Sequence, residues 1–270
     1  MADIRIIELS KVLLSFSFFL YASWSDYKSR EVKNIVWVLY APAGLLLTLI
    51  ELFYSSITLL PLYGLCFIAT LAFAIALFYT GAFGGADAKA LICLALALPF
   101  YPYGLVNVLP VDISPLMHFF FPITVFSNSV LFAALTSIYI LFRNLIWRWR
   151  TSLPLFESEQ RHAPLGRKLL ILLTAYKLPI EKIIEKWYIY PLEDIEESTC
   201  GITRKFILMP KESERDAIVE RLSKAVGKGL ISNSIWASPG LPMLIFITIG
   251  LLVAIVFGDV VWILIKHLLG

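Results

Sequence analysis

Two aspartates lie at the edges of long apolar segments of the sequence. Asp26 follows the apolar run 6–24, and Asp87 immediately precedes the apolar run 88–109. A carboxylate at the edge of a bilayer is energetically costly and is usually retained for a function. Two carboxyl groups brought close together share a proton, so that one can take a proton from water while the other donates one to a substrate carbonyl. These residue types therefore predict the chemistry of an aspartyl protease.

The residues around the second aspartate are compatible with that chemistry. Gly84 and Gly85 lack a Cβ atom, so they allow an extended peptide backbone to approach Asp87 closely, and they permit a tight turn. Ala86 separates them from the aspartate. Lys89 either lowers the pKa values of the carboxyl pair or anchors the following helix at the lipid headgroups.

Each aspartate also has a simpler interpretation. Asp26 could be an interfacial charge or a helix cap that pairs with Lys28 or Arg30. Asp87 could be the N-cap of a helix that begins at Ala88, because Asp is favoured at that position. The matched placement of the two aspartates favours the catalytic interpretation over the two separate structural ones.

The composition of the chain indicates an integral membrane protein. Hydrophobic residues make up 59% of the 270 residues and charged residues only 16%, against about 45–50% and about 25% in soluble domains. This excludes a single water-soluble core, a disordered chain and a disulfide scaffold. Neither the three scattered cysteines nor the histidines form a metal-binding pattern, so we expect no metal and no cofactor.

Six apolar runs are long enough to span a bilayer, which needs about 20 residues. They are 6–24, 35–55, 58–80, 88–109, 118–142 and 241–265. The first run has neither a basic leader nor an A-x-A-like cleavage site, so we interpret it as a retained helix and not as a signal peptide.

The basic residues of the short loops predict the orientation of the chain. They are Lys28, Arg30, Lys33 and Lys89. The loops 51–57 and 101–117, on the opposite side, contain no Lys or Arg. Because basic loops face the cytoplasm, we expect Asp26 and Asp87 on the cytoplasmic side of the cell membrane and both termini outside.

One polar block interrupts the apolar chain. Between Arg143 and Lys228 lie 16 of the 23 Lys and Arg residues and 12 of the 20 acidic residues. Its periodic stretches predict short helices near 165–175, 180–187 and 217–225, and a strand at 202–208. We therefore expect membrane helices 1–5 in residues 1–146, a small mixed cytosolic domain in 147–237, and the sixth helix in 238–270.

Several motifs resemble a known family. Gly84-Gly85-Ala86-Asp87 resembles the G-x-hydrophobic-D signature of the GxGD intramembrane aspartyl proteases, and the segment 26–34 resembles the first-aspartate loop of type IV prepilin peptidases. The segments 121–123, 142–144 and 236–242, with Asn128 and Gly258-Asp259, are similar to archaeal preflagellin and prepilin peptidases. The six-helix pattern with a polar block before the last helix is similar as well.

This resemblance implies a class III signal peptidase. Its substrates would be precursors of archaellins and type IV pilin-like proteins embedded in the lipid bilayer, with no nucleic acid partner. The family's two catalytic aspartates correspond here to Asp26 and Asp87. Paired Cys motifs of the bacterial relatives are missing, so N-methyltransferase activity is not implied. Ala86 stands where relatives often have Gly, which the hydrophobic form of the motif permits.

Such precursors carry a short basic leader, and one acidic cluster of the polar block is a candidate to bind it. The cluster consists of Glu193, Asp194, Glu196 and Glu197. The alternative is a solvated acidic surface without a partner.

Two other classes of function also fit a small helical membrane protein. One is a transporter or channel in which Asp26 and Asp87 bind protons or cations, although the sequence shows no inverted repeat. The other is a scaffold for pilus assembly that uses 147–237 for docking, which leaves the two aspartates without a role.

Overall fold

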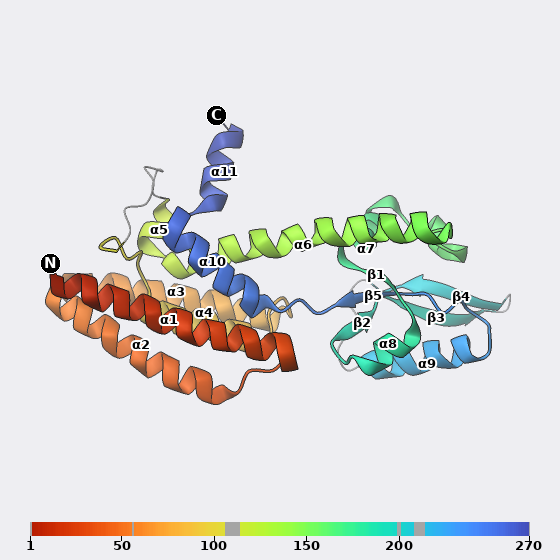
Figure 1. Cartoon of the computed structure of the whole chain (residues 1–270), viewed down its shortest axis with the longest axis horizontal. Coiled ribbons are helices and arrows are strands. Elements are labelled where there is room, and N and C mark those ends of the chain that lie inside the picture. The colour runs from red at the N-terminus through yellow and green to blue at the C-terminus, as the bar shows by residue number, and fades with distance from the viewer. Residues whose placement is uncertain (1, 56, 106–113, 199–200, 208–213, 270) are drawn as a thin grey trace. The chain divides into compact units, whose positions relative to one another are not determined.

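The computed structural model describes residues 2–55, 57–105, 114–198, 201–207 and 214–269, most of which form helices (Figure 1). The residues form two compact units. The helical unit comprises 1–133 and 242–270, and the sheet unit comprises 134–241, so that the division falls inside one long helix. The predicted domain 147–237 lies within the sheet unit.

The helical unit contains the predicted apolar runs as helices. They are α1 (Ala2–Ser29), α2 (Asn34–Ser55), the short η1 (Ile57–Leu59), α3 (Leu60–Tyr79), α4 (Gly85–Ala97), α5 (Pro115–Phe119), the first part of α6 (Phe121–Thr151), α10 (Met243–Phe257) and α11 (Val260–Leu269). Many of their large apolar side chains are exposed on the outer surface of the bundle, as expected where lipid replaces water.

Four helical segments of the described chain are long and apolar enough to cross a membrane, and the bent pair α10 and α11 is a fifth if counted as one span. The predicted multi-pass helical architecture is therefore confirmed, but the six spans are not. The described part of the fourth predicted run, 88–105, contains the 13-residue α4, whereas 106–109 lie outside the described residues. At about 1.5 Å per residue this helix is only about 20 Å long, too short for a hydrocarbon core of about 30 Å.

The sixth predicted run is broken at Gly258, where α10 and α11 meet at 65°. Gly258 has a φ of 77°, in the left-handed region that favours glycine. Asn128 donates from Nδ2 to the Gly258 carbonyl at 2.9 Å and accepts from the Val260 N–H at 3.1 Å. The Ser114 hydroxyl donates to Asp259 Oδ2 at 2.6 Å. Side chains thus satisfy the backbone groups freed by the break.

The short helix α4 is the centre of the helical unit. Leu91 and Leu94 are fully buried. Gly44 of α2 lies directly against Ala97, and a Cβ atom added to Gly44 would come within 2.6 Å of the Ala97 Cβ. Thr48 donates its hydroxyl to the Ala97 carbonyl at 2.9 Å. A small residue and a hydroxyl group therefore let α2 approach α4 closely, which is how helices associate within a membrane.

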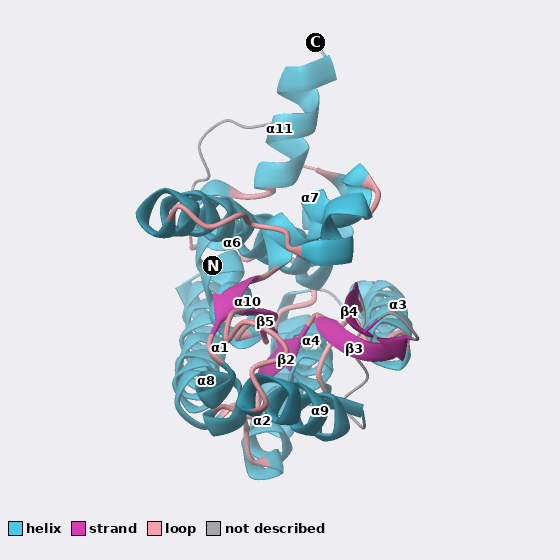
Figure 2. Cartoon of the chain, turned by 90° about the vertical axis from the view of Figure 1, so that its right-hand side faces the viewer, coloured by secondary structure: helices cyan, strands magenta, loops and turns pink. Residues whose placement is uncertain are grey.

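The sheet unit combines the rest of α6 with short helices and strands. These are η2 (Ser158–His162), α7 (Leu165–Thr174), β1 (Tyr176–Leu178), α8 (Ile180–Glu185), β2 (Ile189–Pro191), β3 (Glu193–Ser198), β4 (Gly201–Phe206), α9 (Arg215–Gly227) and β5 (Ile235–Pro239). Figure 2 shows the strands in magenta. β5 pairs antiparallel with β1 and β2, and β3 pairs antiparallel with β4.

The predicted elements of the polar block are present in this unit. The three expected helices correspond to α7, α8 and α9, and the expected strand to β4. The last residue of that expected strand, Leu208, lies outside the described part of the chain.

A buried ion pair fastens the hairpin β3–β4 to the rest of the sheet unit. The Glu193 side chain is fully buried and accepts a hydrogen bond from Arg204 Nη2 at 2.5 Å. It also accepts hydrogen bonds from the Trp236 backbone N–H at 3.0 Å and from the Gln160 side chain. Removing two charges from water is costly. The several hydrogen-bond donors around the Glu193 carboxylate offset this cost.

We predict that Glu193→Ala lowers the free energy of unfolding by about 3 kcal/mol, because it removes the fully buried carboxylate and leaves Glu157 as the acidic partner of the Arg204 guanidinium. The matched control is Glu196→Ala on the same strand, whose exposed partner Lys205 can turn to solvent; its cost is about 0.5 kcal/mol or less. Thermal unfolding of the full chain in detergent, followed by near-UV circular dichroism, measures both. Equal costs for the two variants would contradict this interpretation of Glu193.

Candidate active site

Asp26 lies in the last turn of α1, and local hydrogen bonds hold the end of that helix. Arg30, the first residue after α1, has a φ of 58°, which is unusual for a residue with a Cβ atom. Its N–H donates to the Asp26 carbonyl at 3.0 Å. The hydroxyls of Ser25 and Ser29 donate to the Glu31 carbonyl at 2.7 and 3.1 Å. The position of Asp26 is therefore set by a tightly hydrogen-bonded helix end.

The carboxyl group of Asp26 faces two positive partners. One is the guanidinium of Arg30, and the other is the backbone N–H of Leu244, the second residue of α10. The first N–H groups of a helix have no partner within the helix, and they attract anions. Pro242, the N-cap of α10, has no side-chain hydrogen bond to these groups. An acidic side chain in the last turn of its own helix is unfavourable, and the N-terminus of α10 offsets this for Asp26.

Asp87 lies in the first turn of α4, behind a glycine turn. The turn passes through Gly81, whose φ of 73° places it in the left-handed region. The Gly84 N–H then donates to Asp87 Oδ2 at 3.1 Å. A Cβ atom on Gly84 would lie 3.2 Å from that same oxygen, so the absence of a side chain leaves the carboxyl group room. The helix begins at Gly85 and not at Ala88, so Asp87 is within the helix and is not its N-cap.

The tertiary structure brings the two carboxyl groups into electrostatic contact. Burial, together with the charge of Asp26, raises the pKa of Asp87 to about 7, whereas the Gly84 N–H opposes that rise. A carboxyl group with such a pKa carries its proton for much of the time near neutral pH. The charge of one carboxyl group, at the end of α1, therefore acts on the other, at the start of α4.

The basic residues near the aspartates have separate partners. Lys89, the fifth residue of α4, donates from Nζ to Asn34 Oδ1 at 2.7 Å and so joins α4 to the first residue of α2. Lys28 lies over the Trp24 ring, 5.1 Å from its centroid. Among the three predicted basic residues, Arg30 is the one that faces Asp26.

The acidic cluster predicted to contact a leader peptide lies on β3. Its members are Glu193, Asp194, Glu196 and Glu197. Glu193 belongs to the buried ion pair and has no exposed surface for a peptide to contact. Asp194 pairs with Arg221 at 2.5 Å, and Glu196 pairs with Lys205. The side chain of Glu197 lies outside the described part of the structure.

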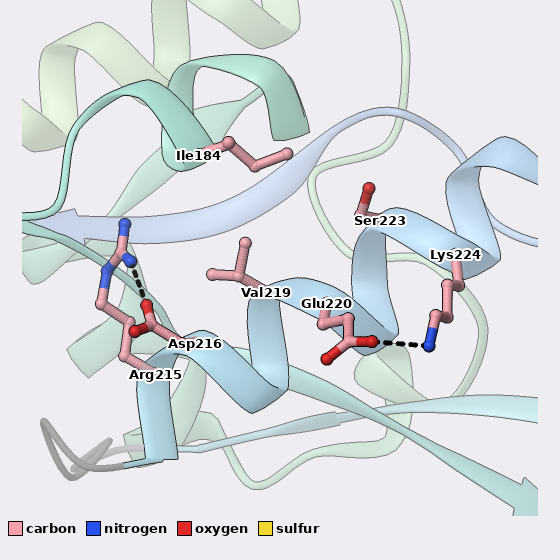
Figure 3. Close-up of a pocket in the computed structure, with 7 residues that line it drawn as sticks. All are labelled: Ile184, Arg215, Asp216, Val219, Glu220, Ser223 and Lys224. Carbon is pink, nitrogen blue, oxygen red and sulfur yellow. Dashed lines mark hydrogen bonds and ion pairs between the residues drawn. The ribbon is translucent and has the colours of Figure 1, made fainter.

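A hollow of about 440 Å³ lies between α8 and α9 of the sheet unit (Figure 3). Its charged residues are already engaged. Arg215 donates to the carbonyls of Ile183 and Ile189 and to Asp216. Glu220 accepts from Lys224 at 2.6 Å. None of the predicted site residues lines this hollow. Within the described residues, no group of three or more His, Cys, Asp or Glu side chains is arranged to hold a metal ion.

The contribution of α10 to the site was not foreseen from the sequence. The proline before an apolar run indicates where a helix begins, so the start of α10 at Met243 follows from the pattern. The sequence does not indicate that the Leu244 N–H of α10 faces the Asp26 carboxylate. That contact depends on how α1 and α10 pack against each other.

The fold is that of a multi-pass helical membrane protein in which the charge of Asp26 acts on Asp87. Residues 13–138 match the model of the type IV leader peptidase family, and residues 167–260 match the archaeal peptidase A24 C-terminus type II. The chain belongs to the type IV leader peptidase family.

Three preflagellin peptidases, two from Methanococcus species and one from Methanocaldococcus jannaschii, are similar to the chain. The protein of Methanococcus maripaludis (strain C6) is 25% identical over 243 residues, which cover 88% of this chain and 90% of the relative. The protein of Methanocaldococcus jannaschii is 26% identical over 241 residues, covering 89% and 90%. The protein of Methanococcus voltae is 32% identical over 136 residues, covering 47% and 54%.

We predict that Asp87 makes stability depend on pH between about 4 and about 7. Because the pKa of Asp87 is raised to about 7 in the folded chain, its contribution favours the folded state fully below about pH 4 and is lost as the pH rises through about 7. The thermal stability of the wild type relative to Asp87→Asn should therefore fall over this range.

The matched variant is Asp26→Asn, which removes the charge that helps to raise the pKa of Asp87. In this background the loss of stability should move to lower pH. A difference between wild type and Asp87→Asn that is constant from pH 4 to 8 would contradict the raised pKa of Asp87, and an unchanged pH dependence in the Asp26→Asn background would contradict the electrostatic effect of Asp26.

Proposed function

We propose that the chain is an aspartyl endopeptidase of the GxGD type. It removes the short basic leader from precursors of archaellins and type IV pilin-like proteins. The observation that carries the proposal is the electrostatic contact of Asp26 with Asp87 in a chain that belongs to a leader peptidase family. The relatives named as preflagellin peptidases cover most of the chain and support the same substrate class.

The surroundings of the two carboxyl groups support distinct roles for them. Asp26 faces the Arg30 guanidinium and the N-terminus of α10, both of which stabilise an anion. Asp87 has a pKa of about 7 because of burial and the nearby charge. In the proposed reaction Asp26 is the ionised general base, and Asp87 is the protonated general acid.

The proposed reaction follows from these roles. Asp26 takes a proton from water while the water oxygen attacks the scissile carbonyl carbon. Asp87 donates its proton to the carbonyl oxygen and thereby neutralises the charge that develops there. The C–N bond of the tetrahedral intermediate then breaks as the proton held by Asp26 passes to the leaving amine, and a hydroxyl group of the intermediate returns a proton to Asp87. Neither a metal ion nor a cofactor takes part in this scheme.

The location of the aspartates at the ends of helices suits a precursor that stays in the membrane. Asp26 lies in the last turn of α1, and Asp87 lies in the first turn of α4. A peptide bond at this level can be cut without unwinding an apolar helix in the middle of the bilayer, where freed backbone groups would lack partners. Basic residues collect on the cytoplasmic side of a membrane, so the nearby Lys28, Arg30 and Lys89 support an active site at the cytoplasmic edge of the cell membrane.

We predict that Asp26→Asn and Asp87→Asn each reduce cleavage of a basic-leader precursor by about a hundredfold or more, because either change removes one half of the acid and base pair. The purified full chain is incubated with the precursor in lipid, and mass spectrometry of the new N-terminus measures cleavage. Asp216→Asn is the control, because its side chain is 92% exposed on the sheet unit and its activity should equal that of the wild type.

Retained cleavage in either of the two Asn variants would overturn the proposed mechanism. A transporter that used these aspartates would instead lose ion flux in the same variants without processing the precursor in the wild type.

A further inference from the structure

Two buried hydroxyl groups join α1 to α10 one turn before Asp26. The Ser23 hydroxyl donates to the Leu244 carbonyl at 2.9 Å and lies 2.7 Å from Thr248 Oγ1. Thr248 Oγ1 lies 2.8 Å from the same Leu244 carbonyl and 3.3 Å from the Phe19 carbonyl. Hydroxyl groups buried among apolar side chains are costly unless they are hydrogen-bonded, and this cluster satisfies both of them across the helix interface.

The residue that both hydroxyls bind is the residue that reaches the site. Leu244 is held at its carbonyl by Ser23 and Thr248, and its N–H faces the Asp26 carboxyl group. Because the first turn of a helix moves as one body, fixing this carbonyl also fixes the direction of the N–H. Ser23 lies three residues before Asp26, so the Ser23 hydroxyl and the Asp26 carboxyl group belong to the same turn of α1.

We propose that Ser23 and Thr248 are positioning residues that hold the first turn of α10 against Asp26, so that the Leu244 N–H stabilises the charged carboxylate during cleavage. This inference rests on the proposed function. Neither hydroxyl group touches the substrate or the reacting atoms. Both act through the backbone of Leu244.

A second hydroxyl pair on α1 provides the comparison that separates positioning from stability. Tyr40 of α2 donates its hydroxyl to Ser15 Oγ at 2.8 Å, and Ser15 donates to the Lys11 carbonyl at 2.7 Å. This pair is also buried and also joins α1 to a neighbouring helix. Ser15 precedes Asp26 by 11 residues, or about 16 Å along a helix, and it does not contact α10 through this pair.

The test is the cleavage assay with the full chain in lipid. The double variant Ser23→Ala, Thr248→Val should reduce kcat roughly tenfold to hundredfold and leave KM within about twofold, since a misplaced donor weakens the transition state more than substrate binding. Thr248→Val alone, which keeps the shape of the side chain, should reduce kcat in the same direction. Thr248→Ser restores the hydroxyl group and should retain most of the wild-type kcat.

The control double variant is Ser15→Ala, Tyr40→Phe. It should lose a similar amount of thermal stability but keep kcat within about twofold of the wild type. An unchanged kcat in the Ser23 and Thr248 variants, with Asp26→Asn inactive, would overturn this inference alone. An equal loss of kcat in the control pair would show a merely structural role and would also overturn it. Cleavage by Asp26→Asn would overturn the proposed function itself.

Discussion

The rest of the site depends on how two half-buried carboxyl groups are placed so that the charge of one acts on the other. Charge on a buried carboxyl group is costly unless fixed donors support it. Asp26 receives that support from Arg30 and from the N-terminus of α10, and Asp87 from the Gly84 N–H. Arg30, in the left-handed conformation after α1, and the glycine turn before α4 each set the position of one carboxyl group.

The helices that carry these groups cannot be held together by hydrophobic attraction alone, because lipid is as apolar as their side chains. Close backbone approach and buried polar contacts take its place. Gly44 brings α2 against α4, and an ion pair of Lys11 with Glu51 joins α1 to α2 far from the aspartates. Ser23 and Thr248 join α1 to α10 beside them. The few polar residues of the apolar runs thus determine which helices lie next to one another.

In the sheet unit, acidic residues that are neighbours in the sequence have different environments. The acidic residues of β3 resemble one another in sequence, yet Glu193 is fully buried with Arg204 whereas Glu196 is exposed beside Lys205. Their difference comes from the alternation of a β-strand, which points successive side chains to opposite faces, and from what packs on each face. The acidic cluster that the sequence suggests as a peptide-binding site therefore includes Glu193, which no peptide can contact.

The sequence by itself predicted the multi-pass helical architecture and singled out Asp26 and Asp87 as candidates, because hydropathy and short motifs are local properties. It also placed Gly84 beside Asp87. Only the tertiary structure decided that α4 is short, that the last apolar run is broken at Gly258, and that α10 supports Asp26. The Ser23 hydroxyl and the Leu244 carbonyl are 221 positions apart. Contacts of that kind arise from the packing of whole helices against one another, which no local pattern in the chain encodes.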